Sequence, residues 1–316
     1  MDLQAINTVA VLGLGTMGHG IAQVFALAGY HVRCYDADAA ARDTLLDRIG
    51  GNLAQMVRAG IVNGDLVDDT LKRISVFANE AAAVESAQFV TEAVAEDLQV
   101  KQELLVRLES HVSPDTILAS NSSSFMITQS AAKMARPERA LVTHWFNPPH
   151  IIPLVEVVPG KRTSDETATT TCALLRHSRK QAVRINKEIP GFLVNRVQMA
   201  MYREIWDLLD QGVASAEEID TAICGSMGLR LAAMGPLKIN DFAGLDISVK
   251  TYEVLVPDMR SDHQVPANIQ KLTDAGHYGT KTGRGFYEYS AESLEADQSR
   301  RDQRYLELVK LLYGGE

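Results

Sequence analysis

The chain has little cysteine, few aromatic side chains and no long hydrophobic run. Its 3 cysteines, Cys34, Cys172 and Cys224, are far apart in the 316-residue sequence and lack the spacing of metal ligands. We therefore expect reduced thiols in a cytoplasmic protein. No apolar segment approaches the roughly 20 residues that a membrane-spanning helix requires. The first residues also lack the basic, apolar and small-residue order of a secretory signal.

An excess of positive charge is missing as well. The sequence has 31 lysines and arginines against 40 aspartates and glutamates, a formal net charge of −9. This balance argues against nucleic acid and anionic membranes as partners, although it is compatible with a local basic pocket for a phosphorylated cofactor. The hydrophobic residues, 46% of the chain, can form a substantial core, and the length is sufficient for two domains.

A glycine-rich turn near the N-terminus is the most informative feature that is present. The apolar segment Val9–Leu12 predicts a buried strand. The sequence that follows it reads Gly13-Leu14-Gly15-Thr16-Met17-Gly18. Gly13 permits a tight turn, Gly15 leaves the backbone open to a pyrophosphate, and Gly18 lets the next helix pack close to the strand. The N-terminus of that helix favours a bound anion. The pattern predicts a dinucleotide site; the alternative is a structural turn in an α/β protein that binds no phosphate.

An acidic residue supports the dinucleotide interpretation and indicates which dinucleotide is bound. The second apolar strand, His31–Tyr35, is followed by Asp36. A carboxylate at this distance from the glycines accepts hydrogen bonds from the ribose diol of adenosine and repels a 2′-phosphate. We therefore predict NAD rather than NADP.

Strand and helix patterns alternate through about the first 190 residues. This alternation predicts an α/β fold with a doubly wound, mostly parallel, Rossmann-like sheet and ligands at the carboxyl ends of its strands. Beyond Pro190–Gly191 we find helical patterns and no convincing strand, which predicts a second, all-α domain. We place the NAD-binding domain at 1–187 and a helical domain for substrate binding and dimerisation at 188–316. The other strand candidates are Ile74–Phe77, Gln88–Thr91, Thr116–Ala119, Ala140–Thr143, Leu154–Val158 and Ala182–Ile185.

Some helices can be placed from the sequence. The residues from Ala39 to about Arg58 predict one long helix, and an apolar face at helical spacing predicts another within Phe192–Leu209. Ser215 before two glutamates predicts a helix start. An amphipathic helix is expected at Glu292–Leu312. We expect some of the apolar faces in the second domain to be buried against another subunit.

A histidine and a glutamate on two predicted strands are candidates for chemistry. His144 ends one strand, and Glu156 lies inside the apolar strand Leu154–Val158. Because a buried carboxylate is costly without a partner, we expect it to pair with His144. Such a pair fixes the imidazole tautomer and leaves the other ring nitrogen as a base, which suits removal of an alcohol proton during hydride transfer. Taken singly, His144 could be a satisfied core histidine and Glu156 a structural ion pair.

Two further polar residues could hold a substrate oxygen. Ser123 follows a predicted strand, and Asn195 lies at the start of the first helix of the second domain. Each has a plainer alternative, since the serine run can be a helix-capping loop and Asn195 an ordinary polar residue near a helix start. A serine hydrolase built on Ser123, His144 and Glu156 lacks the Gly-x-Ser-x-Gly elbow. Three other histidines are assigned as structural or solvent-facing: His19, His150 and His177.

A set of motifs extends along nearly the whole chain. Besides the glycine-rich turn, they are Glu92-Ala93-Val94-Ala95-Glu96, Ser120-Asn121-Ser122-Ser123-Ser124, His144-Trp145-Phe146-Asn147-Pro148, Leu154-Val155-Glu156-Val157, Pro190-Gly191-Phe192-Leu193-Val194-Asn195-Arg196 and Thr280-Lys281-Thr282-Gly283-Arg284-Gly285-Phe286-Tyr287. In their order and spacing, the chain resembles the 3-hydroxyacyl-CoA dehydrogenase family.

The resemblance implies NAD as the cofactor, no metal, and a role for each matching residue. His144 would be the catalytic base, held by Glu156, and Ser123 and Asn195 would contact the C3 oxygen of the substrate. The implied cofactor contacts are Gly13, Gly15, Thr16, Met17, Gly18, Asp36, Glu96, Lys101, Asn147 and Lys281. The family is usually a homodimer through its helical domain, with the active site in the cleft between the domains.

The resemblance implies oxidation of a 3-hydroxyacyl-CoA thioester to the 3-oxo form, as in fatty acid metabolism, but some residues depart from the family pattern. Trp145 and Pro153 stand where phenylalanine and lysine are usual. The segment Met227–Leu237 and the C-terminal helix look closer to the gulonate dehydrogenase and lambda-crystallin, carnitine dehydrogenase and pyridine carboxylate branches. We therefore predict an NAD-dependent 3-hydroxyacyl-CoA dehydrogenase, with a dehydrogenase of a small free carboxylate as the alternative. The basic residues that could meet a CoA phosphate, or form a solvated face, are Arg58, Lys72 and Arg73.

A function of another class is also compatible with a nucleotide site. The lambda-crystallin branch shows that a protein of this kind can bind NAD and serve structurally. The complete set of Ser123, His144, Glu156 and Asn195 argues against that alternative.

Overall fold

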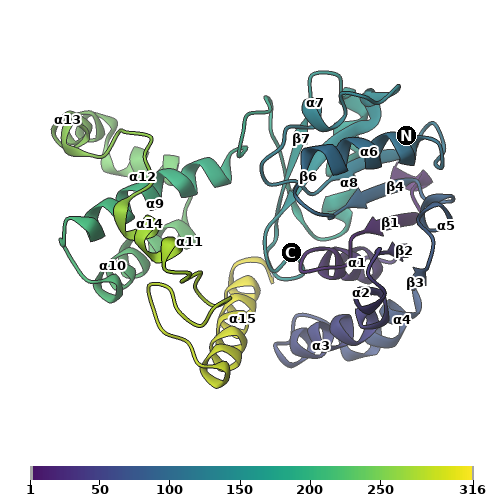
Figure 1. The fold of residues 1–316 in the computed structure, drawn as a ribbon, viewed down its shortest axis with the longest axis horizontal. Coiled ribbons are helices and arrows are strands. Elements are labelled where there is room, and N and C mark those ends of the chain that lie inside the picture. Colours follow the sequence, from purple (N-terminus) through teal and green to yellow (C-terminus); the bar gives the residue numbers. More distant parts are fainter. Residues whose placement is uncertain (1–2, 315–316) are drawn as a thin grey trace. The chain divides into compact units, whose positions relative to one another are not determined.

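The computed structural model describes residues 3–314, and the chain divides into two compact units (Figure 1). The first unit comprises Met1–Leu193 together with Arg301–Glu316, and the second comprises Val194–Arg300. By their compactness the units divide after Leu193, and the end of the C-terminal helix is grouped with the first unit. The functional domains, 1–187 and 188–316, stay a prediction.

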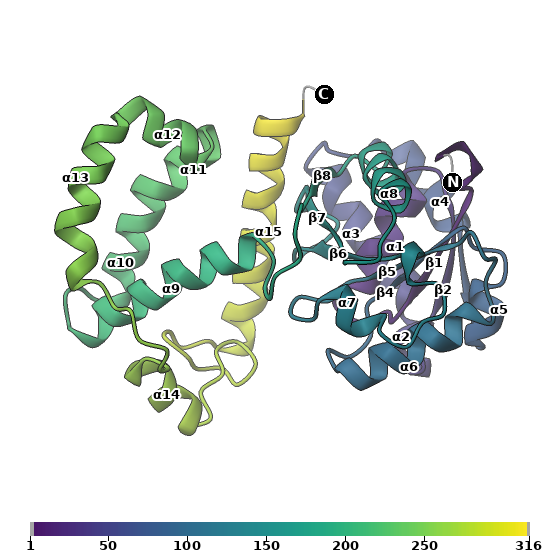
Figure 2. The ribbon, with the colours of Figure 1, turned by 90° about the horizontal axis from the view of Figure 1, so that it is seen from above.

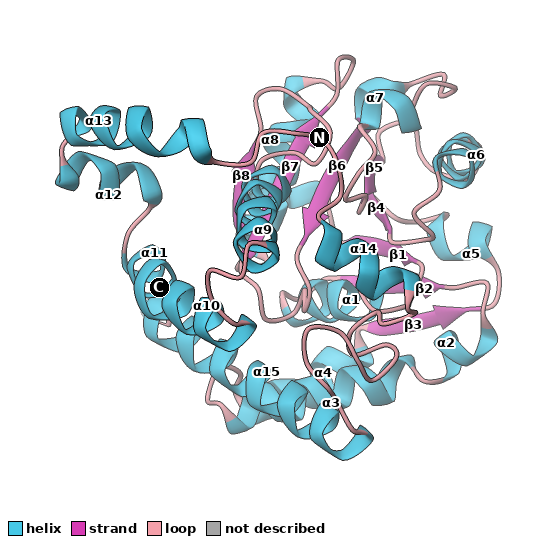
Figure 3. Cartoon of the chain, turned by 60° about the vertical axis from the view of Figure 1, so that its left-hand side comes forward, coloured by secondary structure: helices cyan, strands magenta, loops and turns pink. Residues whose placement is uncertain are grey.

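One eight-stranded sheet forms the centre of the first unit (Figure 3). Its strands are β1 (Thr8–Leu12), β2 (His31–Tyr35), β3 (Ile74–Phe77), β4 (Phe89–Glu92), β5 (Ile117–Ser120), β6 (Ala140–Trp145), β7 (Leu154–Pro159) and β8 (Gln181–Arg184). Each strand overlaps a segment that the sequence predicts. The order across the sheet is β3-β2-β1-β4-β5-β6-β7-β8.

The sheet is mostly parallel, as predicted, with one exception. β3, β2, β1, β4, β5 and β6 pair in parallel, whereas β7 runs antiparallel to β6, and β8 is parallel to β7. The connection from β6 to β7 contains no helix, and a parallel crossover needs about a dozen residues or more. The short connection therefore reverses the chain and places β7 directly beside β6.

Helices cover both faces of the sheet because the strands are apolar on both sides. On β1, Val9 and Val11 pack in one core cluster with Phe25, whereas Ala10 and Leu12 pack in a second cluster on the other face. The first face carries α1 (Gly18–Leu27), α3 (Leu45–Arg58) and α8 (Asp165–His177). The second face carries α5 (Glu80–Val84), α6 (Leu98–Glu109) and α7 (Ile127–Ser130).

The predicted helix from Ala39 to about Arg58 is divided in two. α2 (Ala39–Asp43) begins after Asp38, whose carboxylate accepts a hydrogen bond from the N–H of Ala40, and Thr44 separates α2 from α3. Arg48, near the start of α3, donates to the carbonyl oxygens of Ala41 and Leu14. Through the hydrogen bond from Arg48 to Leu14, the start of α3 is held next to the turn that follows β1. The short helix α4 (Val67–Lys72) precedes β3.

The second unit is helical in the part of the chain that the structure describes, as predicted (Figure 2). Its helices are α9 (Val194–Asp210), α10 (Ala216–Ile223), α11 (Leu229–Ala233), α12 (Pro236–Ala243), α13 (Leu245–Leu255), α14 (Ala267–Asp274) and the first turns of α15 (Ala291–Tyr313). Ser215 forms the predicted helix start as a complete capping box with Glu218. Asp210 accepts hydrogen bonds from the N–H groups of Ala267 and Asn268 and so holds the start of α14.

The last turns of α15 pack on α3 in the first unit, and Figure 3 shows the two helices side by side. Leu306 is fully buried in a cluster with Met56, Val62 and Ile151, and Lys310 donates to the carbonyl oxygen of Ala59. This burial explains why the end of the helix belongs to the first unit. Among residues 3–314, no helix combines the length and the apolarity that crossing a membrane would take.

Candidate active site

The predicted site residues of the first unit gather at one edge of the sheet. Gly13 follows β1, Asp36 follows β2, and Ser123 lies just beyond β5, so all three lie at the carboxyl ends of parallel strands. His144 is near the end of β6, and Glu156 is near the start of the antiparallel β7, which brings both to the same edge. This is the edge at which open α/β sheets bind ligands.

The glycine-rich turn joins β1 to α1 and has the shape that the sequence predicts. Gly13 has a φ of +84°, and a Cβ there would lie 2.6 Å from the carbonyl oxygen of Ala93. A Cβ on Gly18 would lie 1.7 Å from the carbonyl oxygen of Gly13. Both positions therefore require glycine for the fold itself. Gly15 differs, because nothing lies within 4 Å of where its Cβ would be.

Asp36 is fixed beside this turn. Its carboxylate accepts a hydrogen bond of 2.6 Å from the N–H of Leu14 and one of 2.8 Å from the N–H of Asp38. The carboxylate thus spans the ends of β1 and β2.

His19 donates from Nδ1 to the carbonyl oxygen of Gly15 at 2.8 Å. Burial lowers the pKa of His19 by more than the hydrogen bond to Gly15 raises it, and the nearby Arg48 lowers it further.

His144 and Glu156 form the pair that the sequence predicts. The two residues are directly opposite each other in the antiparallel register of β6 and β7. The distance from His144 Nδ1 to Glu156 Oε2 is 2.7 Å, and the two side chains are 3% and 1% exposed. Because a carboxylate accepts, Nδ1–H donates and Nε2 becomes the basic nitrogen of the neutral ring.

A tight turn after β8 completes the surroundings of the pair. Gly191 and Phe192 both have positive φ, at 74° and 52°. This conformation is uncommon for a phenylalanine. It brings the N–H of Leu193 to Glu156 Oε1 at 3.1 Å and places the buried ring of Phe192 against the imidazole of His144, with 5.5 Å between centroids. The ring of Phe146 packs on the same imidazole at 4.5 Å.

Glu96 holds the serine turn that carries Ser123. One carboxylate oxygen of Glu96 accepts from the Ser122 hydroxyl at 2.7 Å and from the N–H groups of Ser123 and Ser124 at 3.0 Å each. Burial raises the pKa of this carboxyl group, but the Ser122 hydroxyl, the nearby Lys101 and these backbone donors outweigh it, so the pKa is below its usual value. Glu96 is therefore ionised at neutral pH.

Lys101 is fully buried and ion-paired. Its ammonium lies 2.9 Å and 3.0 Å from the two carboxylate oxygens of Glu92 and 3.3 Å from Glu96. Glu92 also accepts from the Ser120 hydroxyl and from the N–H of Val94. No role for Glu92 was predicted from the sequence. An acid at the end of the apolar strand Phe89–Glu92 needs a partner for the same reason that Glu156 does.

The other predicted residues are placed within their own units as follows. Thr16 and Asn147 are exposed, the latter just after β6. Asn195 is in the first turn of α9, and Lys281 is exposed in a turn between α14 and α15, both in the second unit. The structure shows the position of each residue within its own unit, and their contacts with substrate and cofactor stay predictions.

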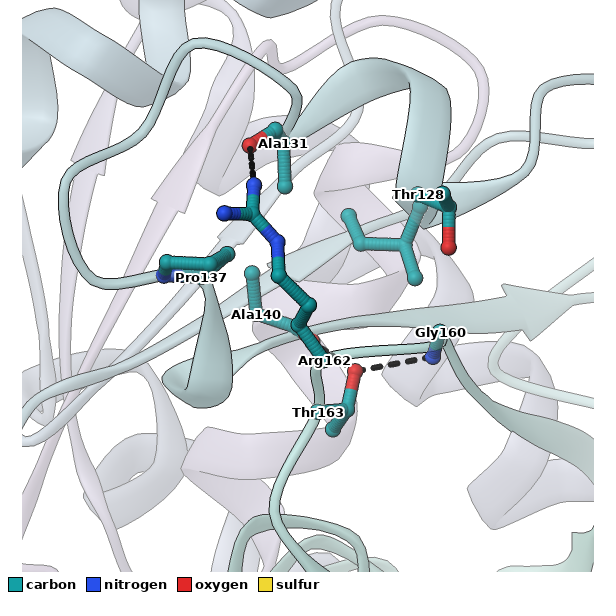
Figure 4. Close-up of a pocket in the computed structure, with 8 residues that line it drawn as sticks. Thr128, Ala131, Pro137, Ala140, Gly160, Arg162 and Thr163 are labelled. Carbon is teal, nitrogen blue, oxygen red and sulfur yellow. Dashed lines mark hydrogen bonds between the residues drawn. The ribbon is translucent and has the colours of Figure 1, made fainter.

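Two hollows lie away from this edge. One of about 10 Å³, room for a single water, lies beside α7 and the first residue of β6, at the other end of that strand from His144 (Figure 4). Arg162 donates across it to the carbonyl oxygen of Ala131. The other, of about 530 Å³, lies by the starts of β1 and β2, where Tyr30 and His177 share a hydrogen bond of 2.8 Å.

No metal centre accompanies the pair in the part of the chain that the structure describes, where His, Cys, Asp and Glu nowhere gather in threes. All three cysteines are free thiols. Burial in β2 raises the pKa of Cys34, which makes it unreactive.

Family profiles match both parts of the chain. The profile described as 3-hydroxyacyl-CoA dehydrogenase, NAD binding domain, matches residues 8–189. The profile described as 3-hydroxyacyl-CoA dehydrogenase, C-terminal domain, matches residues 191–289. Together they cover the sheet and the helices as far as the turn that precedes α15.

Individual relatives agree with the profiles. The chain is 34% identical over 321 aligned positions to 5-formyl-3-hydroxy-2-methylpyridine 4-carboxylate 5-dehydrogenase of Mesorhizobium japonicum, covering 98% of this chain and all of the relative. It is 38% identical over 289 positions to a probable 3-hydroxybutyryl-CoA dehydrogenase of Bacillus subtilis, covering 91% and 99%. A crystal structure of a 5-formyl-3-hydroxy-2-methylpyridine 4-carboxylic acid 5-dehydrogenase, described as an NAD⁺-dependent dismutase, matches with a TM-score of 0.92 at 33% identity, covering 98% and 99%. The chain therefore belongs to the 3-hydroxyacyl-CoA dehydrogenase family and is an NAD-dependent dehydrogenase that acts on a CH–OH group.

Proposed function

We propose that the substrate is a small free carboxylate with an oxidisable hydroxyl group, and not a CoA thioester. One observation carries this proposal: the match to the pyridine carboxylate dehydrogenase extends over 98% of the chain and includes the C-terminal helix. The family profiles end at residue 289, before α15 begins. The Bacillus subtilis relative covers 91% of the chain, so about a tenth of this chain has no counterpart there.

The basic residues named as candidates for contact with a CoA phosphate support the same proposal. Arg73 donates to the carbonyl oxygen of Gly29, and Lys72 pairs with Asp69 at 3.6 Å on the protein surface. Arg58 is in the last turn of α3, next to Ala59, whose carbonyl oxygen accepts from Lys310 of α15. Arg73 and Lys72 are thus engaged by different partners within the protein, and Arg58 lies on another helix, α3.

A CoA thioester is the second candidate. It is favoured by the identity of 38% to the probable 3-hydroxybutyryl-CoA dehydrogenase, which is higher than the 34% to the pyridine carboxylate dehydrogenase. We give less weight to the identity over the shared core than to the match that includes α15. The core would perform the same hydride chemistry for either substrate, so its identity does not discriminate between them. The experiment below separates the two.

The first unit fits the cofactor at the edge described above. Gly15 has open space beside it, and the N-terminus of α1 offers backbone N–H groups to a pyrophosphate. Asp36 is ordered at the end of β2, where the adenosine ribose would bind. We assign Gly13, Gly15, Thr16, Met17, Gly18 and Asp36 to this part of the cofactor, with Asn147 towards the nicotinamide and Lys281 as a further contact.

The His144–Glu156 pair would perform the proton transfer. NAD supplies the hydride acceptor when bound. Glu156 accepts from Nδ1–H and so keeps Nε2 as the base that takes the proton of the substrate hydroxyl. The imidazolium that results is stabilised by the adjacent carboxylate. Ser123 and Asn195 would hold the reacting oxygen, and the rings of Phe146 and Phe192 shield the imidazole from water.

We also propose that the protein is a homodimer through its second unit. The helices α12 and α13 carry large apolar side chains that are well exposed, among them Phe242 at 82% and Leu237 at 79%. Surfaces of this kind are covered in assemblies, and a second copy of the chain presents the same apolar helices.

A substrate screen tests the proposal. Purified protein with NAD is given free hydroxy acids, formylpyridine carboxylates and their hydroxymethyl counterparts, and 3-hydroxyacyl-CoA esters of several chain lengths, and NADH is followed by absorbance. We expect turnover with free acids and at least a 10²-fold lower kcat/KM with the CoA esters. Turnover of CoA esters alone would overturn the substrate proposal, and tight NAD binding without any turnover would favour a structural, crystallin-like protein.

The His144→Ala variant tests the mechanism. We expect NADH affinity to persist while turnover falls by about 10²-fold or more, since a positioned base contributes on this order. His177→Ala is the matched control, because His177 is exposed and bonded to Tyr30 at the other edge of the sheet. Unchanged turnover in His144→Ala would reject His144 as the base.

A further inference from the structure

We infer that Arg42 is a second residue that discriminates between dinucleotides. The unused edge of its guanidinium donates to the 2′-oxygen of the adenosine ribose, whose hydroxyl group donates to Asp36. This inference rests on the proposed placement of that ribose at Asp36. No role for Arg42 was predicted from the sequence.

The side chain of Arg42 returns from α2 to the end of β2. Its Nη1 donates to the carbonyl oxygen of Asp36 at 2.6 Å and to that of Ala37 at 3.2 Å. These two bonds engage both hydrogens of Nη1. They hold the guanidinium against the backbone of the residue whose carboxylate is ordered at this strand end by the N–H groups of Leu14 and Asp38. A cation and an anion are thus both fixed where the ribose would bind.

The other edge of the guanidinium, formed by Nε and Nη2, is unused. Among residues 3–314, these two nitrogens of Arg42 have no hydrogen-bond partner, and no carboxylate pairs with the residue. Two N–H groups on one edge of a guanidinium point in parallel and match two oxygen atoms of one ligand group. Arg42 is half-buried and held through Nη1 alone, so this edge is available to a ligand without loss of the bonds to the loop.

Two other arginines near this strand end are already occupied. Arg48 donates from both terminal nitrogens to backbone carbonyl oxygens, and its Nε is buried. Arg33 donates from Nε and Nη2 to carbonyl oxygens, and its guanidinium lies over the ring of Phe77, 4.1 Å from the centroid. Arg42 therefore offers an edge that neither of these arginines has.

The two fixed charges have opposite effects on a phosphorylated ribose. With NAD, the 2′-hydroxyl can donate to Asp36 and accept from Arg42, which satisfies both of its hydrogen-bonding capacities. A 2′-phosphate would pair with the edge of Arg42 and would be repelled by Asp36. Exclusion of NADP then depends on Asp36 alone, and Arg42 favours NADP once that carboxylate is removed.

Fluorescence titration with NADH and NADPH tests the inference without a substrate. We expect Asp36→Ser to bind NADPH about 10-fold or more tightly than wild type, and Asp36→Ser/Arg42→Met to lose that gain. The ratio of the two Kd values is the decisive quantity, because a purely structural Arg42 would weaken both dinucleotides equally. Arg73→Met in the Asp36→Ser background is the matched control, since Arg73 is also half-buried and bonds a carbonyl oxygen, that of Gly29 before β2. It should leave the ratio unchanged.

An NADH analogue that lacks the 2′-hydroxyl tests the same contact with Asp36 in place. We expect Arg42→Met to weaken binding of NADH by about 10-fold and binding of the 2′-deoxy analogue by about 2-fold or less, because the analogue has no 2′-oxygen to accept the bond. Equal losses for the two ligands would overturn the inference.

The Arg42→Lys variant separates the paired edge from the charge and from folding. Lysine keeps a cation that can reach the two carbonyl groups, but it lacks two parallel donors. In the Asp36→Ser background we expect unchanged thermal unfolding and NADPH affinity reduced by about 5-fold or more. Equal NADPH affinity with lysine or arginine would overturn the assignment of the edge.

Failure of the inference and failure of the cofactor placement give different results. NADPH binding by Asp36→Ser that survives Arg42→Met would overturn the inference alone. If Asp36→Ser changes the binding of neither dinucleotide, the ribose does not lie at Asp36, and the placement of the cofactor falls together with the inference.

Discussion

The orientation of His144 depends on contacts with residues that are far apart in the sequence. Glu156 reaches it across the β6–β7 pair, and Phe192 packs on its ring from a turn with positive φ. The N–H of Leu193 occupies the other oxygen of Glu156. Each oxygen of that carboxylate thus has a donor, which favours one tautomer of the imidazole.

Replacing the carboxylate of Glu156 should therefore impair His144 as a base while leaving its imidazole in place. In Glu156→Gln, the amide can donate to Nδ1, which favours the tautomer that carries its proton on Nε2. We expect kcat to fall by about 10²-fold or more, as the wrong tautomer cannot accept a proton, with NADH affinity unchanged. Stopped-flow absorbance measures the hydride step directly. The control is Glu138→Gln, since Glu138 pairs with Arg136 at the surface. Equal rates for wild type and Glu156→Gln would mean that the carboxylate does not direct the ring.

Lys180 is a second buried cation, and it supports the loop between β6 and β7. Its ammonium donates to the carbonyl oxygens of Pro149 and Ile152 at 2.7 Å and 2.8 Å. Burial lowers the pKa of Lys180 to about 7, far below its usual value of 10.5. The folded protein therefore loses this proton near neutral pH, whereas the unfolded chain keeps it until about pH 10.5.

This difference predicts a pH dependence of stability. Between pH 7 and about 10 the unfolded state binds more protons, so Lys180 makes the free energy of unfolding rise with pH, by up to about 1.4 kcal/mol per pH unit. Urea denaturation of wild type and Lys180→Met at pH 7, 8 and 9 measures it. We expect the stability of wild type to rise relative to that of Lys180→Met over this range. Parallel pH profiles for the two proteins would contradict the depressed pKa.

At the scale of the elements, the sequence predicted which helices and strands form better than it predicted how they are connected. All eight strands overlap predicted segments. The signal is clearest for β4, β5 and β6, whose apolar runs are buried on both faces, whereas β3 and β8 at the two ends of the sheet are largely exposed. The antiparallel direction of β7 relative to β6 was not predicted. The short segment between β6 and β7 carried that signal, because it leaves no room for a crossover helix. The break between α2 and α3 at Thr44 was also missed. The residues on both sides of Thr44 have the composition of a helix, so the sequence does not distinguish two helices from one.

The candidate site shows the same division. The His144–Glu156 pair could be predicted from the cost of a buried acid, and the glycine-rich turn from its motif. The Glu92–Lys101 pair follows from the same cost, but it requires knowing that β4 is buried to its last residue. The end of α15 could not be assigned to the first unit, because its contacts with α3 join segments about 250 residues apart.

The glycines of the turn after β1 allow cofactor binding to be separated from folding. Gly15→Ala should fold with normal stability, since its Cβ meets open space and its φ is ordinary. If the pyrophosphate lies against Gly15, the methyl group should weaken NADH binding at least 10-fold. Fluorescence titration and thermal unfolding test the two parts. Gly51→Ala, in α3 and equally open, should leave NADH binding unchanged. NADH affinity equal to wild type in Gly15→Ala would place the cofactor elsewhere.

At the scale of the whole molecule, the two units differ in how they bury apolar side chains. The first has clusters of buried residues on both faces of its sheet. In the second, among the described residues, the helices α12 and α13 have no buried side chain. Their exposed apolar residues are Leu237, Phe242, Leu245, Ile247, Val249, Tyr252, Val254 and Leu255. Exposed helices with this composition are typical of a surface that another protein chain covers.

A charge introduced among the exposed apolar residues of α12 and α13 should therefore break the proposed homodimer. We expect wild type to sediment as a dimer at micromolar concentration and Phe242→Asp as a monomer, because a desolvated carboxylate without a partner would cost several kcal/mol at the interface. NADH binding should persist in Phe242→Asp, since the glycine-rich turn belongs to the first unit. Leu46→Asp is the control, because Leu46 is exposed on α3 in that unit and its variant should stay dimeric. A monomeric wild type, or a Phe242→Asp variant that remains dimeric, would show that these helices have another purpose.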